Sequence, residues 1–466
     1  MAAFATLADL RAALRGIVTV AADGCTVTDA RRFRQELTDR LTATGVFAED
    51  AAVRDAARWV LRAAAGKLGV VTSSIHPLYM AIGRGQAGGF TVPAVNVRGL
   101  SYDTARAMFR TCQQLEAGAF IFEIARSEIG YTHQRPAEYA TVITAAAIRE
   151  GWQGPVFIQG DHFQANAKKY AADPAVETQA LRDLIAEAIA ADFRNIDIDT
   201  STLVDLSHET LDEQQRANYE RGAELTALIR QLEPKGVTVS VGGEIGEVGK
   251  QNSTVPELRA YLDGYHRTLA RHGEGLVGVS KVSVQTGTSH GGVPLPDGSV
   301  GSVKLDFDAL AALSACAQAE YGLGGAVQHG ASTLPEACFD RFPAIKTVEI
   351  HLATGFQNLA FDHEAFPAGL KAEIYAYLRE NLGNEGTAGE TDEQFVYKTR
   401  KKSWGPFKRQ LWGMADDRRA AIGAALQAKF TQLFTLLGVA NTRGVVADHV
   451  PLVPPVVPAT PAGLLE

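Results

Sequence analysis

The spacing of hydrophobic residues changes twice along the chain. Residues 4 to about 70 show helical spacing only, including an alanine-rich stretch from Asp50 to Leu68. From there to residue 365, short β-branched runs alternate with helical segments, which is the pattern of a parallel sheet. Beyond residue 365 the spacing is helical again. We therefore expect an α/β fold with helices before and after it.

About eight β-branched runs in the middle of the chain predict strands. They are Val92–Val97, Ala119–Ala125, Pro155–Asp161, Asn195–Thr200, Thr238–Glu244, Leu276–Gln285, Gly324–His329 and Thr347–Ala353. Eight parallel strands with helices between them close a (β/α)8 barrel, also called a TIM barrel. A doubly wound open sheet uses the same units, but the number of strands favours the barrel.

These changes of pattern divide the chain into four parts. A helical N-terminal extension is expected over residues 1–72 and the barrel over residues 73–365. A helical C-terminal region, residues 366–448, is expected to pack on the barrel. The proline-rich tail, residues 449–466, is expected to be extended or disordered.

Composition and charge narrow the class of protein. The 466 residues are 46% hydrophobic, so the chain can bury a large core. With 45 Lys and Arg against 53 Asp and Glu, the net charge is −8, which argues against nucleic acid or an anionic membrane as a partner. The first residues lack the apolar core and small-residue cleavage site of a signal peptide, so we expect no secretion, and no run of about 18 apolar residues is uninterrupted. The four cysteines have no paired spacing, so we expect a protein of the reducing cytoplasm.

Three histidines directly follow or end predicted strands in glycine-flanked segments. His162 lies in GDHF, His290 in TSHGG and His329 in QHGAS. Three neutral imidazoles that converge from different strands would hold a zinc-like divalent metal with open positions, as in a catalytic centre. Each histidine alone could equally be an ordinary core or loop residue, so this interpretation depends on the barrel.

Carboxylates stand beside these histidines. Asp161 precedes His162, and in an extended strand the two side chains would leave on opposite sides of the backbone. Asp161 suits removal of a hydroxyl proton, although it could instead cap the following helix. Glu244 and Glu247, in VGGEIGEVG, could carry a proton, or could simply be solvated in a turn. Asp199 lies near the rim of its strand.

Two further features could bind or react with a substrate. The segment HGAST, which contains Ser332, could hold an anion through backbone N–H groups and a hydroxyl. Lys281, in the middle of a strand, could form a Schiff base with a ketone. Alternatively, Lys281 pairs with an inward carboxylate or extends to one end of the barrel.

The order of these motifs resembles that of the class II, metal-dependent fructose-bisphosphate and tagatose-bisphosphate aldolases. The resemblance runs from about Ile75 to Leu359. The motifs that carry it are FTVPAVNVRGL, GDHF, IDTSTL, GGEIGEVG, GTSHG, KLDFDAL and QHGAST.

This resemblance implies a site on a (β/α)8 barrel. His162, His290 and His329 would bind a divalent metal, most often zinc, and a monovalent cation is a further candidate cofactor. Asp161 would act on the C4 hydroxyl and Glu244 on the proton at C3. Positions that match substrate or phosphate contacts of the family are Asn96, Asp199, Gly291, Gly330 and Ser332.

The sequence departs from the family pattern at positions that would contact the phosphate of the substrate. No lysine follows the second histidine, and HLATGF replaces the family's N-x-D-T, so His351 and Thr354 are expected to take over its contacts. We expect Arg126 or the basic cluster Tyr397–Arg409, Arg400 in particular, to supply the missing positive charge.

The expected function is reversible aldol cleavage of a ketose (bis)phosphate. The default substrate is fructose 1,6-bisphosphate, cleaved through a metal-stabilised enediolate to dihydroxyacetone phosphate and glyceraldehyde 3-phosphate. The alternatives are a different ketose or ketose monophosphate, a Schiff-base aldolase using Lys281, and a non-catalytic sugar-phosphate-binding subunit. The family implies a homo-oligomer, either dimer or tetramer.

Overall fold

Eight parallel strands close a barrel in the computed structural model, which describes residues 2–246, 251–287, 305–331 and 334–465. The strands are β4 (Val92–Asn96), β5 (Ile121–Ala125), β6 (Gly154–Gln164), β7 (Asn195–Asp199), β8 (Ser240–Glu244), β9 (Lys281–Val284), β10 (Ala326–Gln328) and β11 (Glu349–Leu352). They pair in chain order, and β11 pairs with β4 to close the ring. The predicted (β/α)8 barrel is confirmed.

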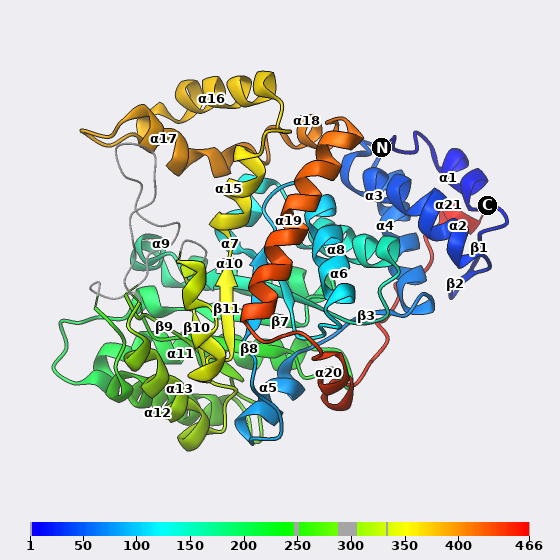
Figure 1. Cartoon of the computed structure of the whole chain (residues 1–466). Coiled ribbons are helices and arrows are strands. Elements are labelled where there is room, and N and C mark those ends of the chain that lie inside the picture. The colour runs from blue at the N-terminus through cyan, green and yellow to red at the C-terminus, as the bar shows by residue number, and fades with distance from the viewer. Residues whose placement is uncertain (1, 247–250, 288–304, 332–333, 466) are drawn as a thin grey trace.

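Helices surround the barrel because its strands need cover on their outer face (Figure 1). These helices are α6 (Ser101–Gln114), α7 (Arg126–Thr132), α8 (Pro136–Glu150), α9 (Ala167–Ala172), α10 (Pro174–Ala190), α11 (Leu211–Leu232), α12 (Val255–His272), α13 (Phe307–Tyr321), α14 (Arg341–Ala344) and α15 (Thr354–Asp362). Two 3₁₀ turns, Ser201–Leu203 and Glu336–Cys338, lie between them. The strands are buried along almost their whole length, which explains why they appear in the sequence as short continuous β-branched runs.

The N-terminal extension contains a β-hairpin as well as helices. Its helices are α1 (Leu7–Leu14), α2 (Ala30–Arg32), the π-helical turn η1 (Phe33–Leu37), α3 (Thr38–Phe47) and α4 (Ala51–Lys67). The hairpin consists of β1 (Val18–Ala21) and β2 (Gly24–Val27), so the expectation of helix alone is wrong here. The β-branched run before Ala22 and the pair Asp23-Gly24, at the end of the turn and the start of β2, favour a hairpin. Strand β3 (Val70–Thr72) then pairs with the start of β6, and α5 (His76–Gly83) leads into the barrel.

The C-terminal region is helical and packs on the barrel. It comprises α16 (Ala368–Leu382), a short turn at Gly383–Glu385, α17 (Asp392–Thr399), the 3₁₀ turn η7 (Arg400–Ser403), α18 (Lys408–Trp412), α19 (Asp416–Leu436) and α20 (Arg443–His449). The long helix α19 lies along α6 and α15 (Figure 1). Turn η7 packs against α7, at the carboxyl ends of the strands.

The proline-rich tail runs back to the N-terminal extension. It is extended until α21 (Ala462–Leu465), which contacts α1 and α4. The indole Nε1 of Trp59 donates a hydrogen bond to the carbonyl of Pro458 at 2.8 Å, and Leu464 is buried. The two chain ends consequently lie on the same side of the molecule (Figure 1).

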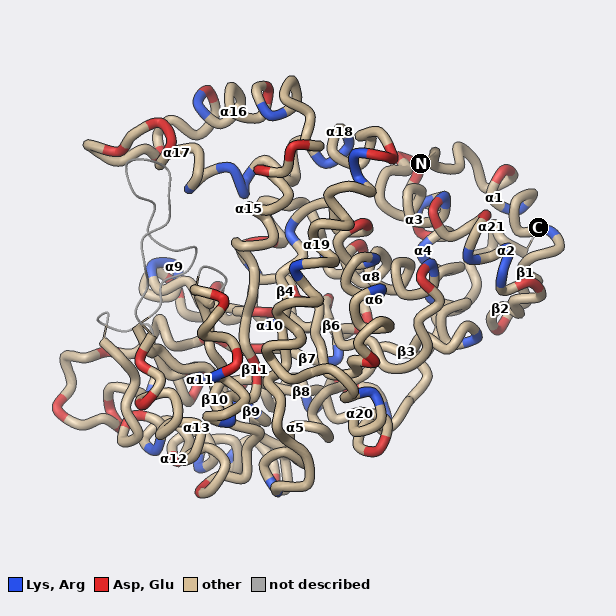
Figure 2. Tube along the Cα trace, in the orientation of Figure 1, with Lys and Arg blue, Asp and Glu red and all other residues tan. Residues whose placement is uncertain are grey.

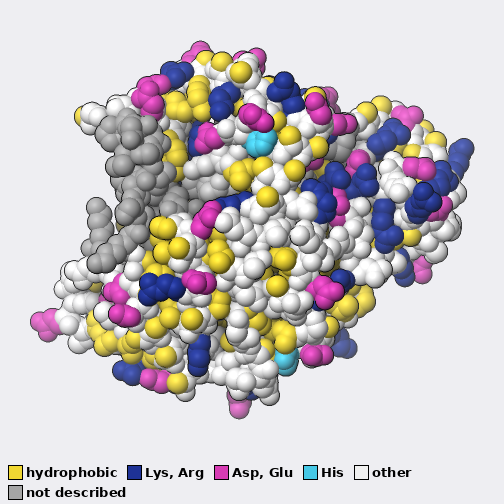
Figure 3. Space-filling view, viewed as in Figure 1, with side chains coloured by type: hydrophobic (Ala, Val, Ile, Leu, Met, Phe, Trp, Pro, Cys, Tyr) yellow, Lys and Arg dark blue, Asp and Glu magenta, His cyan; other side chains and the backbone are white. Residues whose placement is uncertain are grey.

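Charges of both signs are mixed along the chain (Figure 2). The face shown in the space-filling view likewise carries acidic, basic and hydrophobic side chains side by side (Figure 3). Within the described residues, no helix combines the length and hydropathy needed to cross a bilayer.

Candidate metal centre and substrate pocket

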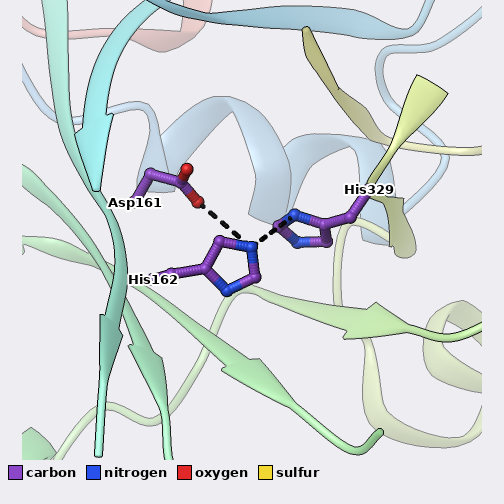
Figure 4. Close-up of side chains that lie close together, drawn as sticks. All are labelled: Asp161, His162 and His329. Atoms are coloured by element: carbon purple, nitrogen blue, oxygen red, sulfur yellow. Dashed lines mark hydrogen bonds and ion pairs between the residues drawn. The ribbon is translucent and has the colours of Figure 1, made fainter. Parts of the chain in front are cut away.

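A backbone irregularity in β6 directs two neighbouring side chains into one site. The pairing of β6 with β7 shifts register between Gly160 and Phe163, and His162 has a left-handed φ of 40°. Such a bulge removes the usual alternation of side chains between the two faces of a strand. Asp161 and His162 therefore both face His329, which follows β10 (Figure 4). The expectation that they leave on opposite sides of the backbone is wrong.

Two histidine nitrogens meet at the centre of this site. His162 Nε2 lies 2.8 Å from His329 Nδ1 and 3.7 Å from Asp161 Oδ1. Together, Asp161, His162 and His329 offer three donor atoms that all lie within 4.8 Å of one another. Nitrogen and oxygen donors at this spacing are the ligand types that a divalent ion such as zinc takes.

The opposite edge of each imidazole is held by a second group. His162 Nδ1 lies 3.1 Å from both Asp199 Oδ2 and Glu244 Oε2, and His329 Nε2 lies 2.9 Å from Ser283 Oγ. Partners of this kind orient metal-binding histidines and make them better ligands. The residues present therefore fit a divalent metal between His162 and His329.

The charge around His162 also favours a cation. Burial alone would lower the pKa of His162, but Asp161 and Glu244 outweigh it and raise that pKa well above its usual range. The same carboxylates would attract a metal ion in place of the proton. His162, Asp199 and Glu244 form a second group that could hold a cation.

Asp161 is held as an ionised carboxylate. Asn96 Nδ2 donates to its Oδ2 at 2.7 Å, and His351 Nδ1 lies 3.1 Å from its Oδ1. Burial would raise the pKa of Asp161, but His162 and His351 outweigh it and hold the pKa below its usual range. Asp161 does not cap the following helix, because the side chain of Asn166 caps α9.

A pocket of about 500 Å³ opens above these residues. Among the predicted site residues, it is lined by Asn96, Arg126, Asp161, His162, His329, Gly330, His351 and Thr354. Asp199 and Glu244 lie behind His162 rather than on the pocket wall. His290, Gly291, Ser332 and Glu247 lie outside the described residues.

Arg98 and Lys169 line the pocket but escaped the sequence reasoning, whereas Lys401 belongs to the predicted basic cluster Tyr397–Arg409. Arg98, two residues after Asn96, donates to Glu128 Oε1 at 2.5 Å and to Thr354 Oγ1 at 3.2 Å. Lys401, in η7, also lines the pocket. Within the described part of the chain, the amine of Lys401 forms no hydrogen bond or ion pair. The NVRGL turn could have pointed to Arg98, but Lys401 becomes visible only through the packing of η7 on α7.

Apart from Lys401, the residues expected to supply positive charge are mostly paired already. Arg126 lines the pocket, but its guanidinium bonds Glu177 and the carbonyl of Gln164. Arg400 pairs with Asp362 at 2.8 Å and with Asn358 at 2.6 Å. In the rest of the Tyr397–Arg409 cluster, Lys398, Lys402 and Lys408 each contact a glutamate, respectively Glu390, Glu385 and Glu138.

Lys281 is unsuited to Schiff-base chemistry. Its amine contacts Gln159 Oε1 at 2.8 Å, Asp197 Oδ2 at 2.9 Å and Glu349 Oε1 at 2.5 Å inside the barrel. Burial alone would lower the pKa of Lys281, but Asp197 and Glu349 outweigh it and raise the pKa. Because a protonated amine is not a nucleophile, the alternative pairing with inward carboxylates is the one found.

Fold and site together define a (β/α)8 barrel with a histidine- and carboxylate-lined candidate metal centre at the carboxyl ends of its strands. The sequence model of the family described as Fructose-bisphosphate aldolase class-II matches residues 79–398. The chain belongs to the class II fructose-bisphosphate aldolase family. No curated protein matches the sequence.

Solved structures share the fold at low sequence identity. A fructuronate-tagaturonate epimerase from Cohnella laeviribosi is 14% identical, with a TM-score of 0.54 over 84% of this chain and 86% of that one. A probable tagatose 6 phosphate kinase from Sinorhizobium meliloti is 17% identical, with a TM-score of 0.51 over 80% and 96%. The fructose-bisphosphate aldolase of Campylobacter jejuni is 15% identical, with a TM-score of 0.48 over 80% and 97%. The likenesses to the first two structures concern the fold alone.

Proposed function

We propose that the protein is a metal-dependent aldolase that reversibly cleaves the C3–C4 bond of a ketose (bis)phosphate. The observation that carries this proposal is the convergence of His162, His329 and the ionised Asp161 in one pocket. Fructose 1,6-bisphosphate is the default substrate, with dihydroxyacetone phosphate and glyceraldehyde 3-phosphate as products. We further propose that the enzyme acts in the cytoplasm as a dimer or tetramer.

His162 and His329 would hold the divalent metal, which we take to be zinc, with His290 as the third ligand implied by the family. When bound, such an ion supplies Lewis-acid polarisation of a ketone carbonyl. Asp199 and Glu244, which meet at His162, could in addition hold a monovalent cation.

Asp161 is placed to take a proton from the substrate. Asn96 and His351 fix both of its oxygens, and its low pKa keeps the carboxylate ionised. In cleavage, Asp161 removes the proton of the C4 hydroxyl, the C3–C4 electron pair moves toward the ketone, and the aldehyde leaves. Glu244, the mobile carboxylate that the family implies, would then leave its contact with His162 and deliver the proton to C3.

An anionic group of the substrate would bind beside Lys401 and Arg98. Arg98 forms an ion pair with Glu128. Both cations line the same pocket, and burial, followed by the neighbouring Arg98 guanidinium, lowers the pKa of Lys401. A phosphate between them would relieve this repulsion and form charge-assisted hydrogen bonds. Lys401 thus replaces Arg400 as our candidate from the basic cluster, and Arg126 and Thr354 remain candidates on the wall.

A substrate panel tests the proposal. Purified protein is incubated with fructose 1,6-bisphosphate, tagatose 1,6-bisphosphate and fructose 1-phosphate, and the released aldehyde is measured. We expect cleavage of at least one, with Asp161→Asn inactive on the same substrate. Metal binding without cleavage of any of the three would contradict the proposal and favour a sugar-phosphate-binding subunit.

A further inference from the structure

A line of buried hydrogen bonds connects the centre of the barrel to Asp161. The Lys281 amine donates to Glu349 Oε1 at 2.5 Å, and His351 Nε2 lies 2.6 Å from the same oxygen. His351 Nδ1 in turn lies 3.1 Å from Asp161 Oδ1. All four side chains are buried, and only Asp161 and His351 reach the pocket wall.

Neighbouring side chains fix the inner end of this line. Gln159 Nε2 donates to Glu349 Oε1 at 2.9 Å, and the hydroxyl of Tyr79 bonds the other oxygen of Glu349. The three N–H groups of the Lys281 amine are used by Glu349, Gln159 and Asp197. Glu349 therefore cannot turn away from His351 without breaking several buried contacts.

The arrangement also excludes another role for His351. Both ring nitrogens face carboxylates, because Nδ1 lies near Asp161 and, at 3.2 Å, near Glu123, while Nε2 faces Glu349. Neither nitrogen is available to a phosphate. The expectation that His351 takes over the family's phosphate contacts therefore fails on the geometry.

Stability alone does not account for such a network. Small barrels usually fill with Val, Ile and Leu, and replacing a buried ion pair by apolar residues of similar volume is often neutral or stabilising. Here the barrel interior instead holds Glu123, Asp197, Lys281 and Glu349, next to His351. The only member of the network that combines a polar contact to His351 with a place on the pocket wall is Asp161.

We propose that His351, held by Glu349 and Lys281, is a positioning residue that fixes the carboxylate of Asp161 in the orientation needed to take a proton from substrate. Asn96 fixes the second oxygen, so the carboxylate is held from both sides. This inference rests on the proposed aldolase function, because it assigns a task to Asp161.

Two matched substitutions of His351 test the contacts of its two ring nitrogens separately. In His351→Asn the amide can take the place of Nδ1 and keep the contact with Asp161, whereas in His351→Gln the longer side chain reaches toward Glu349 and loses Asp161. Each variant is assayed for cleavage and for exchange of the dihydroxyacetone phosphate C–H proton with solvent deuterium. This exchange depends on Glu244 and the metal and does not need Asp161.

We expect His351→Gln to lower kcat for cleavage by about 100-fold, with KM and the exchange rate changed by less than about 3-fold. His351→Asn should recover at least about 10-fold of that loss. Glu349→Gln, which is isosteric and lies away from the pocket, should show the same selective loss of cleavage to a smaller degree. This variant tests the inference if a His351 variant does not fold.

Two results would overturn the inference while leaving the aldolase proposal intact. One is full cleavage activity in His351→Gln and Glu349→Gln; the other is an equal loss of cleavage and exchange, which would indicate a purely structural role. If the unmodified protein catalyses neither reaction, the aldolase proposal itself fails and takes this inference with it.

Discussion

At the scale of single residues, the site depends on one backbone conformation. His162 adopts a left-handed φ, which costs a non-glycine residue about 1 kcal/mol or more, and this turns both Asp161 and His162 toward the pocket. The residue types and their order could be predicted from GDHF, but the bulge could not, because it depends on how β6 pairs with β7. For the same reason, the roles of Arg98 and His351 appear only once the strands are placed together.

The contacts of His162 predict that substitutions at His162 and at Asp199 weaken metal binding to different degrees. His162→Ala removes a ligand and should abolish stoichiometric zinc binding, whereas Asp199→Asn removes only the charge behind that ligand and should weaken zinc binding by about 10–100-fold. Metal content after dialysis against a competing chelator measures both. His208→Ala, an exposed control that does not line the pocket, should bind zinc normally. Normal zinc binding in His162→Ala would contradict the assignment.

Another histidine predicts a pH effect on stability. Burial, with help from Arg230 and Arg84, lowers the pKa of His76 to about 4. In the unfolded chain the pKa is near 6.5, so the folded state prefers the neutral ring; the resulting stability is complete above about pH 6.5 and is lost as the pH falls toward 4. Acidification from pH 7.5 to pH 5 should thus cost the wild type about 2 kcal/mol more than His76→Gln in urea unfolding. If acidification lowers the free energy of unfolding of the wild type and of His76→Gln by the same amount, this explanation is excluded.

At the scale of elements, the barrel could be predicted from the sequence, but the position of the segments that pack on it could not. Buried parallel strands leave continuous β-branched runs and polar carboxyl ends, which is why all eight appear in the sequence. The position of η7 depends instead on tertiary packing. A Cβ at Gly99 would lie 2.0 Å from the Trp404 ring, so the absent side chain lets the segment that carries Lys401 pack on the loop after β4. That close approach brings Lys401 to Arg98.

The position of Lys401 on the pocket wall therefore predicts that it contributes to substrate binding. Lys401→Met should raise KM for the phosphorylated ketose by about 10–100-fold, the value of a charged hydrogen bond, with a smaller change in kcat. Steady-state kinetics measure this. Lys402→Met is the matched control, because its amine pairs with Glu385 and it does not line the pocket. Equal KM values for the Lys401 and Lys402 variants would remove Lys401 from the substrate site.

At the scale of the whole molecule, the tail and the N-terminal extension support each other away from the pocket. Trp59 bonds Pro458, and α21 contacts α1 and α4. The sequence predicted an extended or disordered tail, but its docking site could not be foreseen, because the contacts join residues some 399 positions apart. The family model begins only at residue 79, so it says nothing about this part of the chain.

Removal of the tail tests this arrangement. A chain ending at Val450 should lose about 2–5 °C in Tm and gain solvent quenching of Trp59 fluorescence, while kcat and KM stay within about 2-fold. Replacing Trp59 by Phe, which removes the indole N–H and leaves a smaller aromatic ring, should give a smaller loss of Tm. An unchanged Tm after truncation would show that the tail adds no stability.

The most direct test of the central claim is the dependence of ketose-phosphate cleavage on bound metal. The protein is stripped with a chelator, then titrated with zinc, and the cleavage rate is recorded together with the zinc bound. Our account predicts negligible activity without metal, recovery in proportion to zinc up to one ion per chain, and no recovery in His162→Ala. Full cleavage by the stripped protein would contradict it.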